Sequence, residues 1–92
     1  MAQVVVTLRI MPKSPSVNLS KIEKEALDKI FAFAGKGDTK IEQTPIAFGL
    51  KSLNIIFIMK EEQGSTESLE NDIAKIQGVQ SVEVTDVRRA VG

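Results

Sequence analysis

The hydrophobic residues of this chain follow two spacings, one typical of strands and one typical of helices, and the changes from one spacing to the other fall at prolines and glycines. Residues Val4–Met11 (VVVTLRIM) are rich in β-branched side chains and precede Pro12, which is typical of a strand that ends in a turn. The next stretch, residues 12–20 (PKSPSVNLS), contains two prolines and three serines. This composition predicts a loop between the strand and the element that follows.

An amphipathic helix follows this loop. Asn18 is one candidate N-cap, and Ser20, with Glu23 in a capping box, is the other. Residues 35–38 (GKGD) should end the helix, because glycine takes the left-handed conformation of a helix C-terminus at low cost. The apolar positions recur at spacings of three and four: Leu19, Ile22, Ala26, Ile30 and Phe33.

Two strands and a connecting segment occupy the middle of the chain. Residues Thr39–Thr44 predict a second strand, and the segment PIAFG connects it to a third strand at Leu50–Met59. In the third strand both faces are largely apolar toward its end, which favours an interior position in a sheet. Phe57 lies on the same predicted face as Leu53 and Ile55, where a core position is expected.

A second helix and a final strand complete the pattern. Ser65 or Thr66 can cap the helix, and Gly78 should stop it. The final strand (VQSVEVTDV) alternates Val82 and Val84 inward with polar residues outward. The apolar positions of the second helix are Leu69, Ile73 and Ile76.

The order strand, helix, strand, strand, helix, strand predicts an α+β fold. It is the split β-α-β arrangement of the ferredoxin-like sandwich, with a four-stranded antiparallel sheet and both helices on one face. Ninety-two residues are enough for one domain, so we expect a single ferredoxin-like domain over residues 1–92.

Composition removes several kinds of chemistry. Twelve basic and twelve acidic residues cancel, so no overall field attracts nucleic acid or an anionic membrane. The chain has no cysteine or histidine, the usual thiolate nucleophile and the commonest general base and metal ligand. Neither a signal peptide nor an apolar run of membrane-spanning length is found, and a cytoplasmic location is expected. We predict no metal site, no cofactor and no covalent catalysis.

Three other functions of this fold class can be weighed against the residues. An RNA-binding sheet needs exposed aromatic residues on its central strands, and here only Phe57 lies there, in an expected core position. A small phosphatase needs an anion cradle and an oriented amide, for which Lys13 and Asn54 are weak candidates. A small-molecule-binding regulatory module that dimerises through its sheet edges remains an alternative, because this fold supports many activities.

Two stretches combine apolar residues with exposed charges at strand ends, where loops reach partners: PIAFGL with the following Lys51, and the ending VTDVRRAVG. Here the chain resembles a known family, archaeal translation elongation factor 1-beta, and more distantly the catalytic domain of the eukaryotic factor. The opening VVVTLRIMPKSPSVNL, the central PIAFGLKSLNI, the acidic loop after it and the ending GVQSVEVTDVRR carry this resemblance over essentially the whole chain.

The resemblance implies guanine nucleotide exchange on elongation factor 1-alpha, the GTPase that delivers aminoacyl-tRNA to the ribosome. In the family, the Phe of the P-I-x-F-G motif enters a pocket on the nucleotide-binding domain of the GTPase. That residue corresponds to Phe48, with Pro45 and Gly49 shaping the turn and Lys51 just beyond it. The eukaryotic domain also carries a penultimate Lys that reaches the Mg²⁺ site of the GTPase. Here no Lys matches it, and Arg88 or Arg89 is the candidate for that positive charge.

Overall fold

The strands and α-helices follow one another in the order that the sequence predicts. The computed structural model describes residues 2–90, so that Met1, Val91 and Gly92, the ends of the predicted domain, lie outside the described residues. The elements are β1 (Gln3–Pro12), α1 (Leu19–Ala34), β2 (Thr39–Pro45), β3 (Lys51–Lys60), the 3₁₀ turn η1 (Glu61–Gln63), α2 (Glu67–Ala74) and β4 (Val79–Ala90).

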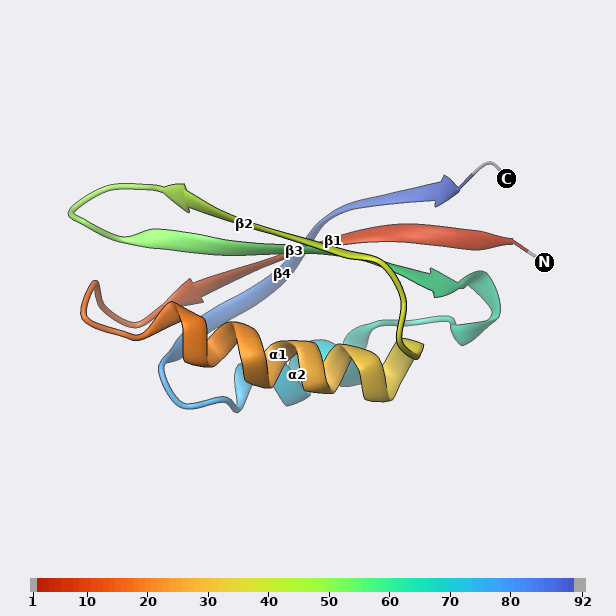
Figure 1. Cartoon of the computed structure of the whole chain (residues 1–92), viewed down its shortest axis with the longest axis horizontal. Helices are drawn as coiled ribbons and strands as arrows, with labels where there is room; N and C mark the ends of the chain where they lie inside the picture. Colours follow the sequence, from red (N-terminus) through yellow and green to blue (C-terminus); the bar gives the residue numbers. More distant parts are fainter. Residues whose placement is uncertain (1, 91–92) are drawn as a thin grey trace.

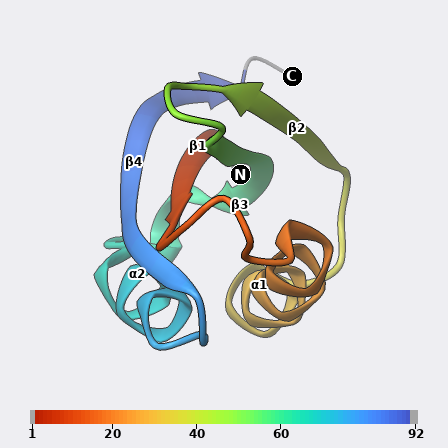
Figure 2. The ribbon, with the colours of Figure 1, turned by 90° about the vertical axis from the view of Figure 1, so that its left-hand side faces the viewer.

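The four strands form one antiparallel sheet in the order β2-β3-β1-β4. Both helices lie against the same face of this sheet (Figure 1). Seen from its end, the sheet is an arch whose concave side faces α1 and α2 (Figure 2). The ferredoxin-like fold predicted from the sequence is therefore confirmed, including the interior position of β3.

The core fills the space between the arch and the helices. Every second residue of β1 and β3 faces the helices, as the strand period requires, and Phe57 is 1% exposed, which confirms its predicted core position. The buried apolar side chains are Val6, Leu8, Ile10, Ile22, Ala26, Ile30, Leu53, Ile55, Phe57, Met59, Leu69, Ile73, Ile76 and Val79.

The helix ends settle two alternatives that the sequence left open. Asn18 caps α1, accepting a hydrogen bond from the backbone N–H of Lys21 at 3.3 Å. At α2, Thr66 occupies the N-cap position, but the hydroxyl of Ser65 accepts from the Glu67 N–H at 3.1 Å. Ile76 is buried as predicted, although α2 ends at Ala74, because a tight turn carries the chain onward and keeps its side chain in the core.

A β-bulge in β4 changes which residues face the helices. Val84 pairs with Leu8, whereas Asp86 pairs with Thr7, so Thr85 is an extra residue between them. Before the bulge Val82 and Val84 face inward, as predicted. After it the register places Val87 and Arg89 on the inward side, because one added residue reverses the alternation, but both stay exposed there, Val87 at 58%.

Candidate functional site

The β2–β3 hairpin projects beyond the rest of the sheet (Figure 1). Its paired strands end at Pro45 and Lys51, which lie opposite each other. Between them the backbone N–H of Ile46 donates to the Leu50 carbonyl at 2.8 Å, and the Leu50 N–H donates to the Ala47 carbonyl at 3.0 Å. The tip is therefore a hydrogen-bonded turn with a defined backbone.

Phe48 stands at the tip of this turn with 96% of its surface exposed. Its φ is +58°, in the left-handed region, which non-glycine residues other than Asn and Asp enter at a cost of about 1–2 kcal/mol. The following Gly49 is also left-handed, with φ +78°, which turns the chain back toward β3. Ile46 adds a second exposed apolar side chain, 49% exposed. A strained turn that holds an aromatic ring in solvent is typical of a binding contact.

A second loop supports the hairpin. Gly49 faces Pro15 from the segment between β1 and α1, since a Cβ built on Gly49 would lie 3.7 Å from the Cβ of Pro15. Hairpin, loop and the start of α1 enclose a groove of about 440 Å³, with Lys51 on its wall. The sequence assigned no contact to Pro15, although this residue lies in the opening stretch VVVTLRIMPKSPSVNL that carries the family resemblance.

Polar side chains join the two strands at the root of the hairpin. The amide of Asn54 donates to the hydroxyl of Thr44 across the strands at 2.9 Å and to that of Ser52 at 3.4 Å. Ser52 is 2% exposed, so this bond keeps a buried hydroxyl paired. The mid-strand amide is thus engaged in the sheet rather than oriented toward an anion.

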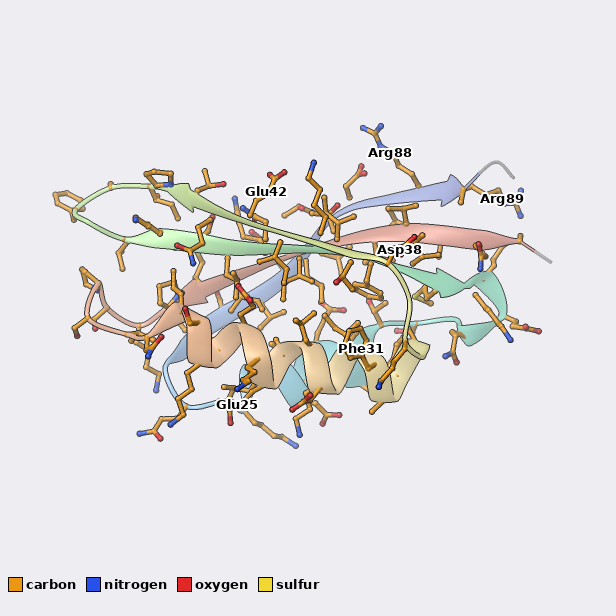
Figure 3. All side chains as sticks on the ribbon, in the orientation of Figure 1. Glu25, Phe31, Asp38, Glu42, Arg88 and Arg89 are labelled. Carbon is orange, nitrogen blue, oxygen red and sulfur yellow. The ribbon has the colours of Figure 1, made fainter. Side chains whose placement is uncertain are left out.

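Arg88 and Arg89 lie at the opposite end of the sheet from the hairpin (Figures 1 and 3). Arg89 pairs through Val4 with Met59, eight residues along β3 from Lys51, a separation of about 26 Å at 3.3 Å per residue. The structure therefore does not bring the predicted hairpin residues and the two predicted arginines together.

The two arginines also differ from each other. Arg89 lies on the inward side after the bulge and donates twice to the carboxylate of Glu61 in η1, at 2.7 and 2.8 Å. This hydrogen-bonded ion pair raises the pKa of Arg89 above its usual value. Arg88 points away from the helices (Figure 3), with its Nε 2.9 Å from Asp86.

Residues 2–90 contain no group of three or more acidic side chains placed to hold a metal ion. Within the same range, neither α-helix is long and apolar enough to cross a membrane.

Residues 5–90 match the model of a protein family described as the EF-1 guanine nucleotide exchange domain. The chain is 49% identical over 92 residues to elongation factor 1-beta of Methanobrevibacter smithii, covering 97% of this chain and 98% of the relative. It is 43% identical over 89 residues to elongation factor 1-beta of Methanothermobacter thermautotrophicus, with the same coverage. With elongation factor 1-beta of Methanocaldococcus jannaschii it shares 39% over 93 residues, covering 98% of this chain and all of the relative.

Two solved structures share the fold at low sequence identity. The de novo designed protein Foldit4 superimposes with a TM-score of 0.64 at 18% identity, covering 98% of both chains. The protein described as BlrP1 BLUF superimposes with a TM-score of 0.55 at 11% identity, covering all of this chain and 57% of that one. These similarities concern the fold alone.

Proposed function

The chain belongs to the EF-1 guanine nucleotide exchange domain family, and we propose that it promotes the exchange of GDP for GTP on elongation factor 1-alpha during protein synthesis. The family and its elongation factor 1-beta relatives support a role in translation. We further propose that it works in the cytoplasm with this GTPase and makes no direct contact with nucleic acid, in keeping with its net charge of zero.

The exposure of Phe48 carries the proposal. Its ring is 96% exposed, so it contributes nothing to the core of its own domain. Buried in a pocket of the GTPase, an aromatic side chain of this kind is typical of a residue that dominates an interface. The Pro45–Lys51 pair, the left-handed Gly49 and the turn hydrogen bonds define the backbone at Phe48 before binding, which lowers the backbone entropy lost on association.

Exchange requires no covalent step. GDP release is accelerated when the exchange factor binds the nucleotide-free GTPase more tightly than the GDP-bound form, since the coupling between the two binding sites is reciprocal. A ~100-fold weakening of nucleotide binding corresponds to about 2.7 kcal/mol of coupling. One buried aromatic anchor with a neighbouring charged contact is sufficient for an energy of this size.

We place a second contact at the C-terminal end of β4, where Arg88 and Arg89 supply positive charge. This end lies about 26 Å from the root of the hairpin, from the strand register. A GTPase that contacts both the hairpin and the end of β4 must therefore extend along the whole sheet. Alternatively, it contacts the two ends with two separate regions of its own surface. The hairpin alone is the contact on which the exchange proposal depends.

The direct test is the release of labelled GDP from the cognate elongation factor 1-alpha, measured with and without the protein. We expect the rate to increase and to saturate with protein concentration. An unchanged rate at saturating protein, with binding to the GTPase demonstrated separately, would overturn the exchange proposal.

A further inference from the structure

We propose that the loop of residues 12–18 and the β2–β3 hairpin form one basic docking surface, complementary to a partner pocket for Phe48 that is bordered by Asp and Glu side chains. This inference rests on the proposed function, because the partner is the GTPase that the hairpin contacts. It adds the chemistry of the partner surface and assigns a binding role to Lys13 and to a loop that no family feature places there.

The loop is attached to both of its neighbours. Pro15 lies beside Gly49 at the hairpin tip, where an added Cβ would come within 3.7 Å of it, while the backbone N–H of Lys13 donates to the Gly78 carbonyl at 2.8 Å on the other side. Val17 packs against Gly78 so closely that a Cβ there would lie 2.8 Å from its Cγ1. The loop therefore holds a fixed position between the hairpin and the turn before β4, at the end of the molecule that Figure 2 faces.

Two hollows flank this loop, and no acidic residue lines either of them within the described chain. The larger, of about 440 Å³, lies on the hairpin side and is lined by Lys51 together with serines and Asn18. The smaller, of about 260 Å³, lies toward Gly78 and is lined by Lys21 and uncharged residues. A partner segment meets hydroxyl, amide and ammonium groups in the larger hollow, and amide and ammonium groups in the smaller, all of which suit carboxylates.

The lysines at this end have no acidic partner within the described residues. Lys13, Lys21 and Lys51 are exposed, and the four ion pairs found between residues 2 and 90 involve other basic residues. The first turn of α1 contains no acidic residue, so the charge of Lys21 is not offset within that turn. Charges that their own fold leaves uncompensated attract a surface of opposite sign and accelerate its association.

Nucleic acid would also be attracted by these lysines, but the aromatic group favours a protein. Phe48 stands on a narrow turn beside a groove, not on an open platform of aromatics on which bases stack. A single ring at the tip of a hydrogen-bonded hairpin suits insertion into an apolar pocket.

Reversal of two charges tests the surface. In K13E/K51E we expect kcat/KM for GDP release from the cognate elongation factor 1-alpha to fall at least about tenfold at low salt, with kcat much less affected. We also expect the variant to lose most of the salt dependence of the wild type. The matched control is K24E/K36E, which changes the net charge equally at exposed positions outside this surface. Melting temperatures of both variants establish that they are folded.

Three outcomes decide between the possibilities. Equal losses in the two double variants, or no loss in K13E/K51E, would overturn the surface while leaving the exchange function intact. If the wild type binds the GTPase without accelerating GDP release, and K13E/K51E does not bind it, the surface would be supported and the exchange proposal overturned. Salt-sensitive binding of wild type to single-stranded RNA that K13E/K51E abolishes would assign the lysines to nucleic acid instead, and the proposal would be wrong.

Discussion

The two ends of the sheet differ in whether their exposed basic side chains are paired with carboxylates of the same chain. At the hairpin end, Phe48 is in solvent and Lys13 and Lys51 pair with no acidic residue among residues 2–90. At the other end, Arg88 and Arg89 are each paired with a carboxylate of the same chain. Charge and apolar surface left uncompensated within a fold are available to a partner. Paired charges also hold their own segment in place, so we expect mutations at the hairpin end to lower binding more than mutations at the second contact proposed for the other end.

The largest effect is expected for Phe48→Ala. Loss of a buried aromatic anchor costs about 2–4 kcal/mol of binding free energy, so stimulation of GDP release should fall about 30- to 1,000-fold. Thermal stability should be unchanged or slightly higher, because the ring makes no core contacts in its own domain. Ile46→Ala is the matched control, as a half-exposed apolar residue of the same turn, and should have a smaller effect. If the Phe48 variant stimulates exchange as well as the wild type, the ring is not part of the interface, and the proposed difference between the two ends of the sheet is wrong.

Gly78→Ala should give the largest loss of stability. Its φ of +95° disfavours a side chain, and the added Cβ would lie 2.8 Å from the Cγ1 of Val17. We expect about 2–4 kcal/mol from strain and overpacking together, measured by chemical or thermal unfolding. Exchange per folded molecule should also fall, because displacement of Val17 shifts the loop that supports the hairpin.

Two variants separate strain from contact. In a Val17→Ala background the same Gly78→Ala change should cost distinctly less, since the clash is removed and only the backbone strain remains. Gly64→Ala, near the other end of the sheet, also has a positive φ but no atom within 4 Å of its added Cβ. It should lower stability and leave exchange per folded molecule unchanged. Equal losses of exchange in Gly64→Ala and Gly78→Ala would contradict a special role for the loop of residues 12–18.

At the other end of the sheet, a charge swap distinguishes positioning from contact. Arg89→Glu and Glu61→Arg should each lower exchange, by less than about tenfold, because each breaks an exposed ion pair. The double variant should recover part of this loss, since the swapped pair again holds the end of β4 against η1 while the contact proposed for Arg89 stays lost. Full recovery would show that Arg89 only positions the end of β4, and the second contact would then have to come from Arg88. Arg88→Ala, whose side chain points away from η1, provides the comparison.

The sequence could predict the fold and the hairpin, but not the division between the arginines. Hydrophobic period and glycine positions predict every strand and helix, because these signals are local. The outward direction of Phe48 came from the family resemblance, because a Pro and a Gly around an apolar turn fit a buried turn as well. The bulge at Thr85 leaves no comparable mark in the sequence, yet it decides that Arg89 and not Arg88 faces Glu61.

The contacts of Pro15 and Asn54 were unpredictable for a related reason. Each depends on residues that are distant in the chain or on the partner strand, Gly49 for Pro15 and Thr44 for Asn54. Single-sequence patterns carry the local period of an element but not the register between two elements. The role of the hairpin itself came from the family resemblance and remains a prediction.

The smallest effect is expected at the root of the hairpin, for Thr44→Val. The change keeps the β-branched shape and removes the hydroxyl that accepts from Asn54, so it should lower the free energy of unfolding by about 0.5–1.5 kcal/mol. If this bond stiffens the hairpin that carries Phe48, exchange per folded molecule should also fall slightly, by less than about fivefold. The effect on exchange should disappear in a Phe48→Ala background, because a looser hairpin matters only while the ring is the contact. Thr39→Val, at the far end of the same strand, is the matched control and should not change exchange. A loss for Thr44→Val that persists without Phe48 would show that the strand itself, rather than the ring it positions, meets the GTPase, and the functional end of the molecule would then extend from the turn into the sheet.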